Sequence, residues 1–109
     1  MQLLLRSLFS LSLLLVGSVH AEKAILDTVI NGKRVVTAYE NGVKSGPELH
    51  YYDTGELAFE VEFIDNIQQG VERHYYQNGQ RRGEIAFQDG VKHGDMFSWY
   101  ESGWYSNSS

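Results

Sequence analysis

The most constraining feature of this sequence is an internal repeat, in which glycines and aromatic pairs return at one fixed spacing. The series are Gly46, Gly70 and Gly94; Gly55, Gly79 and Gly103; and the pairs Tyr51-Tyr52, Tyr75-Tyr76 and Trp99-Tyr100. The difference 70 − 46 = 24 gives the repeat period. A repeat of this length is one supersecondary unit that buries its apolar side chains by stacking on its neighbours. The chain is therefore expected to form an elongated array.

Each repeat unit has the pattern of a β-hairpin. The strings DTGE, QNGQ and ESGW carry a glycine that suits a turn with positive φ. Apolar and polar side chains alternate from Leu57 to Ile64, which is the period of a strand. We interpret NGVKSG, NIQQG and DGVKHG as polar connections between hairpins. No stretch after residue 21 has a convincing helical period, so the fold class is predicted to be all-β.

The distribution of apolar residues predicts a register for these hairpins. We place Asp53 and Thr54 in a type I turn and Gly55 at a left-handed bulge position. The resulting pairs are Tyr52 with Glu56, Tyr51 with Leu57, Leu49 with Phe59, Glu48 with Glu60 and, in the next unit, Glu72 with Glu84. A two-residue turn at Thr54-Gly55 would instead mix apolar and charged side chains on both faces, because a one-residue slip reverses every side chain.

Two faces of different chemistry follow from this register. The apolar face is expected to carry Val35, Tyr39, Leu49, Tyr51, Phe59, Val61, Phe63, Tyr75, Ile85, Phe87, Phe97 and Trp99. The polar face is expected to carry Glu48, His50, Tyr52, Glu60, Glu62, Glu72, His74, Tyr76, Arg82 and Glu84. A single sheet has no second layer, so the apolar face needs cover from curling of the sheet, from a second copy in a homodimer or from a partner.

The turn and connection strings resemble those of the MORN-repeat variant family, whose units carry a YYxNG pattern. The matching strings are YYDTGEL at residues 51–57, YYQNGQ at 75–80 and GVKHG at 90–94. The resemblance implies an elongated, single-layer antiparallel sheet of successive hairpins, with about two and a half units in residues 41–109. It also implies a scaffold or interaction surface, and some bacterial members are described as antitoxins. The third unit departs from the pattern, since Ser98-Trp99 replaces His-Tyr.

The first 21 residues have the layout of a secretory signal peptide. Arg6 precedes an apolar run from Leu8 to Val16, and Val19 and Ala21 occupy the −3 and −1 positions of a cleavage site. The run is shorter than the roughly 20 residues of a membrane span, and an uncleaved N-terminal anchor is the alternative. Cleavage after Ala21 leaves 109 − 21 = 88 residues, exported to the periplasm or secreted. Residues 22–40 are expected to form an N-terminal hairpin or cap around Asn31-Gly32.

The charge balance narrows the expected partners. The formal net charge is −5 and becomes −6 once Arg6 is removed. A chain this acidic should be repelled by nucleic acid and by anionic lipid headgroups. We therefore expect no nucleic-acid partner, no membrane insertion after cleavage, and a protein or peptide, basic in character, as the partner. The chain has no cysteine, so packing and sheet hydrogen bonds must stabilise it without disulfides.

The candidate partner-binding residues are the repeated histidines, tyrosines and glutamates of the polar face. They are Glu48, His50, Tyr52, Glu72, His74, Tyr76 and Tyr100. In the predicted register, glutamates recur twice in each repeat period and form an acidic stripe that would dock a cationic partner. The alternative is that these charges only keep the face soluble. The glycines Gly46, Gly55, Gly70, Gly79, Gly94 and Gly103 are assigned to the architecture of the repeat.

Metal binding and catalysis are both weakly supported by these residues. Each Glu-x-His pair lacks the close spacing of H-E-x-x-H or C-x-x-C, and Ser98 interrupts the histidine series, so no metal and no cofactor are predicted. There is no cysteine nucleophile, no G-x-S-x-G elbow and no phosphate-binding glycine motif, so no enzyme is predicted. The predicted function is an exported protein-interaction or scaffold module. The alternatives are an antitoxin or immunity-type protein that neutralises a toxin, and a small structural protein of the envelope.

Overall fold

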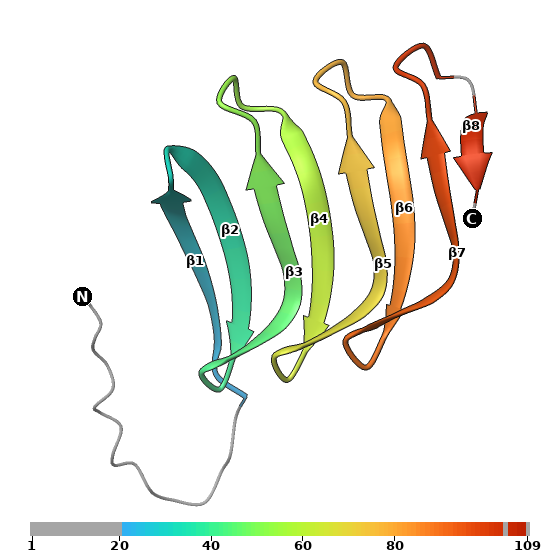
Figure 1. Cartoon of the computed structure of the whole chain (residues 1–109). Helices are drawn as coiled ribbons and strands as arrows, with labels where there is room; N and C mark the ends of the chain where they lie inside the picture. The colour runs from blue at the N-terminus through green and yellow to red at the C-terminus, as the bar shows by residue number, and fades with distance from the viewer. Residues whose placement is uncertain (1–20, 104, 109) are drawn as a thin grey trace, which may run out of the picture.

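The computed structural model describes residues 21–103 and 105–108, which form one open antiparallel sheet (Figure 1). Its eight strands pair in sequence order: β1 (Lys23–Ile30), β2 (Lys33–Glu40), β3 (Val43–Tyr51), β4 (Leu57–Ile64), β5 (Ile67–Tyr75), β6 (Arg81–Gln88), β7 (Val91–Trp99) and β8 (Tyr105–Ser108). These residues contain no helix, and so none that is long and apolar enough to cross a membrane. The predicted all-β, single-layer fold is confirmed. The expected signal peptide lies outside the described residues, apart from Ala21.

At one end of the sheet the strands are joined by two-residue turns in which both residues have positive φ. The φ angles are 54° and 84° at Asn41-Gly42, 50° and 70° at Asp65-Asn66, and 52° and 81° at Asp89-Gly90. Asn31-Gly32, which joins β1 to β2 at the opposite end of the sheet, has the same geometry. Aspartate, asparagine and glycine tolerate this conformation, which matches the twist of the flanking strands. The strings NGVKSG, NIQQG and DGVKHG are therefore not connections, since most of their residues are paired in β3, β5 and β7.

The other turns carry the second glycine series. Gly55, Gly79 and Gly103 have φ angles of 104°, 89° and 97°. In the first of these turns, the Gly55 N–H donates to the Tyr52 carbonyl at 2.9 Å, and the Tyr52 N–H donates to the Glu56 carbonyl at 2.8 Å. The expected pairing of Tyr52 with Glu56 and of Tyr51 with Leu57 is therefore observed.

Beyond these pairs the predicted register is wrong, because the repeat hairpins β3–β4 and β5–β6 each contain a further bulge, whereas the β1–β2 hairpin is regular. Tyr51 pairs with Leu57 but His50 pairs with Phe59, so Ala58 is an extra residue in β4. The pairs expected between Leu49 and Phe59, Glu48 and Glu60, and Glu72 and Glu84 do not form. The observed pairs are Leu49 with Glu60, Glu48 with Val61 and Glu72 with Ile85. One extra residue moves every later side chain to the other face, and here it separates glutamates that would have repelled one another.

The first glycine series lies inside strands, at a third irregularity. Gly46, Gly70 and Gly94 have positive φ and lie within β3, β5 and β7. At Gly46, Thr37 pairs with Glu48 and Tyr39 pairs with Lys44, so Ala38 faces a wider stretch of β3. A Cβ on Gly46 would approach the Ala38 Cβ to 3.0 Å. Figure 1 shows β3, β5 and β7 curving strongly along this part of their length.

The sheet has one sheltered side, which we call the histidine face because it carries His50 and His74. Residues paired across an antiparallel sheet share a face, so the pairing places Val35, His50, Phe59 and His74 together. Val35, Thr37 and Val61, the three side chains that are buried among the described residues, all lie on this face with exposed fractions of 4%, 4% and 7%. The sheltered side is thus the small core of the protein.

The expected apolar face is divided between the two sides of the sheet. The register places Val35, Tyr39, Phe59, Val61, Phe63, Ile85 and Phe87 on the histidine face. Leu49, Tyr51, Tyr75, Phe97 and Trp99 lie on the opposite face. The continuous apolar face, for which a homodimer was one of three expected forms of cover, is therefore not formed, because the bulge at Ala58 reverses the second strand of the hairpin.

Tyrosine hydroxyls fasten each repeat unit to the next. The Tyr52 hydroxyl donates to the Tyr75 carbonyl at 2.5 Å, and the Tyr76 hydroxyl donates to the Trp99 carbonyl at 2.8 Å. Each side chain crosses the intervening strand to reach a carbonyl 23 residues further along the chain. The second tyrosine of each Tyr-Tyr pair therefore has a structural role, which is to connect neighbouring units.

Substitution of Gly79 tests the left-handed turn. Nothing lies within 4 Å of an added Cβ, so Gly79→Ala should act through backbone strain alone and lower the free energy of unfolding by about 1 kcal/mol or more. Gly83→Ala is the matched control because Gly83 lies in β6 without positive φ. Urea unfolding measures both variants. Equal stability of the two variants would contradict the turn assignment.

Removal of the Tyr76 hydroxyl tests the fastening between units. Tyr76→Phe should lower the free energy of unfolding by about 1 kcal/mol, because the hydrogen bond from the Tyr76 hydroxyl to the Trp99 carbonyl is removed. Tyr100→Phe is the control, since Tyr100 is the third copy and its side chain is 61% exposed. Thermal unfolding followed by circular dichroism should show a lower midpoint for Tyr76→Phe only. A similar loss in both variants would argue against the hydrogen bond.

Candidate binding face

A row of stacked rings crosses the middle of the histidine face. The Phe59 ring lies between His50, with a centroid distance of 4.1 Å and an interplanar angle of 12°, and His74, at 5.0 Å and 21°. The three residues come from β3, β4 and β5, and adjacent strands are about 4.8 Å apart, so one ring per strand gives a continuous stack. The extra residue at Ala58 is what turns Phe59 to this face.

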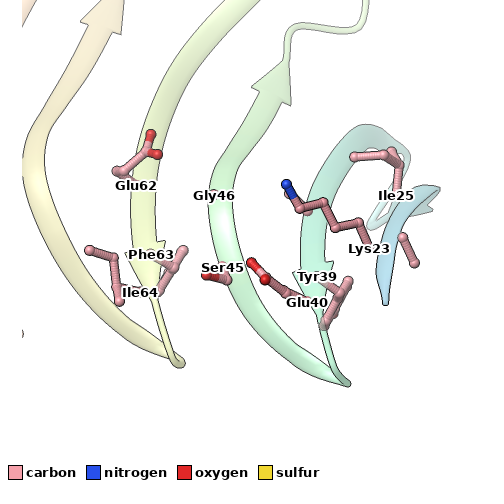
Figure 2. A pocket seen from close by; sticks show the side chains of 11 residues that line it. Lys23, Ile25, Tyr39, Glu40, Ser45, Gly46, Glu62, Phe63 and Ile64 are labelled. Carbon is pink, nitrogen blue, oxygen red and sulfur yellow. The ribbon is translucent and has the colours of Figure 1, made fainter. Parts of the chain in front are cut away.

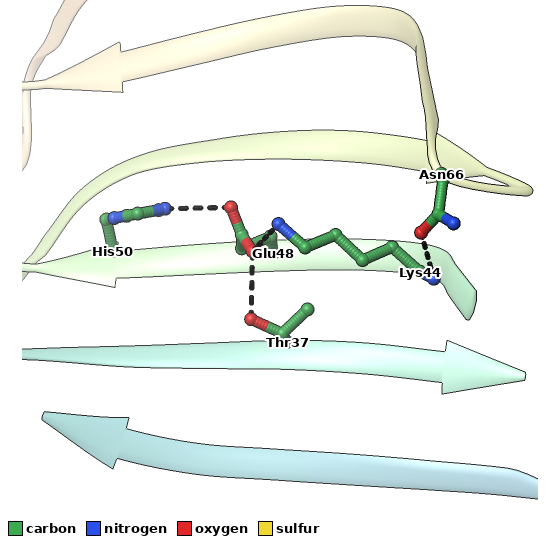
Figure 3. Close-up of polar contacts among 5 residues, drawn as sticks. All are labelled: Thr37, Lys44, Glu48, His50 and Asn66. Carbon is green, nitrogen blue, oxygen red and sulfur yellow. Dashed lines mark hydrogen bonds and ion pairs between the residues drawn. The ribbon is translucent and has the colours of Figure 1, made fainter. Parts of the chain in front are cut away.

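Each histidine of the stack is paired with a glutamate two residues earlier on the same strand. His50 Nε2 lies 3.1 Å from Glu48 Oε1 (Figure 3). The other oxygen, Glu48 Oε2, accepts a hydrogen bond from Thr37 Oγ1 at 2.9 Å. It also forms an ion pair with Lys44 Nζ at 2.8 Å. The same figure shows Asn66 accepting from the Lys44 main-chain N–H. The carboxylate of Glu48 is thus bonded on both oxygens.

This environment shifts the pKa of Glu48 downward. Burial of the carboxylate, whose side chain is 12% exposed, would by itself raise the pKa. The hydrogen bonds from Lys44, His50 and Thr37 outweigh that effect and lower the pKa from its ordinary value of 4.5. Glu48 is therefore held as a charged acceptor that orients His50.

The second unit contains a simpler copy of this arrangement. His74 Nε2 lies 2.5 Å from Glu72 Oε2, and Gln68 Nε2 donates to Glu72 Oε1 at 2.7 Å. Gln68 stands one repeat period after Lys44, and Val61 stands one repeat period after Thr37. The third unit has Met96 and Ser98 in place of the glutamate and the histidine. The Glu-His pair is thus present twice and lost in the third copy.

The candidate residues do share a region, although the acidic stripe does not form. Glu48, His50, Glu72 and His74 lie together on the histidine face. Tyr52 and Tyr76 adjoin it and use their hydroxyls to bridge units, whereas Tyr100 belongs to the third unit and is largely exposed.

The remaining glutamates of the expected stripe lie on the opposite face. There Glu60 and Glu84 pair with Arg73 from the two sides. Arg73 Nε lies 3.5 Å from Glu84 Oε2, and the Tyr75 hydroxyl donates to Glu60 Oε2 at 2.8 Å. Burial, followed by the hydrogen bond to Glu60, raises the pKa of Tyr75. The bulges have thus separated the four glutamates and given each a polar partner.

An open hollow of about 370 Å³ lies over the ring stack and draws on five consecutive strands and the turns beside them. It is lined by Lys33, His50, Tyr51, Tyr52, Ala58, Phe59, His74 and Arg82. Among the described residues that line it, every titratable group other than the tyrosines is a nitrogen base, and none is acidic. Lys33 is paired with Asp53 at 2.9 Å, while the Arg82 guanidinium lies 5.9 Å from the centre of the Tyr76 ring. The hollow therefore combines aromatic walls with cationic rims.

A second hollow, of about 500 Å³, lies near the other end of the strands (Figure 2). It is lined by residues of β1 to β4, including Lys23, Tyr39, Glu62 and Phe63. None of the candidate partner-binding residues lines it. We therefore place the candidate site at the ring stack.

The described residues contain no cluster of three or more metal-ligating side chains. Histidine, aspartate and glutamate side chains come together only in smaller groups across residues 21–103 and 105–108. The Glu48-His50 and Glu72-His74 contacts are pairs of this kind. What the face offers a ligand is aromatic surface and hydrogen-bonding groups.

Comparison with protein families matches two segments to a family described as MORN repeat variant, at residues 44–65 and 68–89. These segments are MORN repeats. Each runs from early β3 or β5 through the hairpin to the end of β4 or β6, so the family unit coincides with one structural hairpin. MORN repeats are in general protein or membrane binding modules and not a catalytic family. No curated protein and no solved structure matches the chain.

Sequence reasoning misses several residues of this face. The alternating pattern assigns Phe59 to the apolar face and gives Lys33 and Lys44 no place in a site. The repeat spacing holds a usable signal, because Leu57-Ala58-Phe59 in one MORN repeat corresponds to Arg81-Arg82-Gly83 in the next. The change from apolar to basic residues, and from a phenyl ring to no side chain, indicates that the two units differ in function at these positions.

Acid unfolding tests the state of Glu48. Its lowered pKa means that the folded protein binds this proton less tightly than the unfolded chain does, so its stabilisation is fully present above about pH 4.5. The stabilisation is lost as the pH falls through the folded pKa. Glu48→Gln should therefore show a smaller decline of unfolding free energy between neutral pH and pH 3, measured by urea titrations. An unchanged decline would contradict the role of Glu48.

Proposed function

We propose that this MORN-repeat protein is an exported protein-interaction module and that its partner docks on the histidine face, at the hollow over the ring stack. The hollow carries the proposal, because it brings aromatic and cationic side chains from successive strands to one place. Aromatic side chains and arginine are enriched in protein–protein interfaces. Export is supported by the signal-peptide layout of residues 1–21.

Binding is favoured over catalysis by the state of the titratable groups. Glu48 is bonded by three donors and held charged, so it is poorly placed to accept a further proton from a substrate. Both Glu-His pairs place the imidazole Nε2 beside the carboxylate two residues earlier, and this shared contact assigns no distinct acid and base roles to them. The pairs are therefore best understood as supports that fix the orientation of the two imidazole rings.

Affinity capture from an extract of the cell envelope tests this proposal. The full chain with a C-terminal tag would be expressed in its own cells, so that any processing occurs. The double variant His50→Ala, His74→Ala removes two walls of the hollow. The control Arg34→Ala, Arg73→Ala removes two partly exposed cations that contact the opposite face. We expect a protein partner that is captured by the wild type and the control and lost with the histidine variant. Equal capture by all three would place docking elsewhere.

A further inference from the structure

The ring stack on the histidine face stops at a position where the repeat would continue it. His50, Phe59 and His74 occupy successive strands, and the next residue in the same row is Gly83 on β6. Gly83 stands one repeat period after Phe59, so it is the same position of the next MORN repeat. The first unit fills this position with a phenyl ring, and the second unit leaves it without a side chain.

The backbone at Gly83 leaves room for a Cβ. Among the described residues other than its chain neighbours, only the Phe97 carbonyl oxygen comes within 4 Å of an added Cβ, at 3.4 Å. Gly83 does not have positive φ, so no turn geometry requires glycine there. One side of the His74 ring is covered by Phe59, and the next strand on its other side is β6. His74 remains 29% exposed. We call this space the Gly83 slot.

The unit that loses the ring also gains positive charge. Leu57-Ala58-Phe59 becomes Arg81-Arg82-Gly83. Arg81 lies 3.8 Å from Glu84, whereas Arg82 makes no ion pair with any residue that the structure describes and instead lies over the Tyr76 ring. Arg82 is on the rim of the hollow beside His74. A ligand in the Gly83 slot would therefore meet an imidazole face and an arginine that favours a carboxylate.

We propose that the Gly83 slot receives an aromatic side chain from a partner protein, stacked on His74, while an adjacent carboxylate of the same segment pairs with Arg82. The inference rests on the proposed function and specifies the chemistry of its partner. The bound ring completes the stack in the second repeat as Phe59 does in the first. Although the protein is acidic overall, the positive charge of Arg82 lies at this slot. The slot therefore selects a segment with an aromatic residue next to an aspartate or glutamate.

Peptide titrations followed by NMR of the full chain test this assignment. The probe is a capped Gly-Phe-Asp-Gly peptide, compared with versions in which leucine replaces phenylalanine or asparagine replaces aspartate. We expect saturable shifts at the His74 ring and the Gly83 amide. The loss of the ring or of the carboxylate should each weaken binding about three- to tenfold. Binding of the leucine peptide as tightly as the phenylalanine peptide would overturn the assignment.

Two substitutions at Gly83 separate the slot from the fold. Gly83→Phe supplies the missing ring from within, so it should abolish binding of the probe while the protein stays folded. Gly83→Ala adds only a Cβ and should keep the affinity within about twofold, since its nearest contact is at 3.4 Å. Arg82→Gln should remove the preference for aspartate over asparagine. Unchanged binding by Gly83→Phe, with dispersed amide signals, would exclude the slot.

A further comparison identifies the source of the ligand. N-acetylphenylalanine carries both a ring and a carboxylate, so equal affinity for it and the peptide would overturn the assignment to a protein segment. Failure of all peptides, together with histidine-dependent capture of a partner, would refute the slot and leave the proposed function standing. Peptide binding without any captured partner would support the slot chemistry and refute the proposed function.

Discussion

The structure depends on one constraint: a sheet of a single layer cannot sandwich side chains between two sheets or under helices. Its side chains must shelter one another along the rows that cross the strands. The row of Val35, His50, Phe59 and His74 does this on one side, and the buried Val61 and Thr37 flank Glu48 in the next row. Tyr52 and Tyr76 then close each unit against the next. Polar side chains are part of the core for this reason, and the Glu-His pairs satisfy their hydrogen bonds within it.

The fold was predictable from the sequence because its period is a property of the residue types alone. The repeat spacing and Asn31-Gly32 predict hairpins without any knowledge of packing. The face assignment was not predictable, because it depends on the single extra residue at Ala58, and alanine carries no local signal for a bulge. That residue sends Phe59 to the side of His50 and Glu60 to the side of Arg73. An alternating pattern describes which residues share a face only between bulges.

The candidate site contains residues that repeat between the units and residues that differ between them. The residues that repeat faithfully, such as Tyr52 and Tyr76, hold units together. The residues that change between units set the chemistry of the surface: Phe59 against Gly83 and Ala58 against Arg82. Sequence reasoning selects the repeated His-Tyr pairs as the site, and these do lie near the hollow. It does not select the positions that differ between units, because the repeat is recognised from the residues that are the same in each unit.

The tyrosine fastening has a consequence for how such a protein can change its size. Each hydroxyl reaches a carbonyl 23 residues further along the chain, and neither contact depends on which copy supplies it. Duplication or loss of one whole repeat unit would rejoin equivalent donors and acceptors, whereas an insertion of another length between units would misalign them. The array can therefore lengthen or shorten in steps of two strands, about 10 Å of sheet each. A lineage could then acquire additional rows of surface without a new fold.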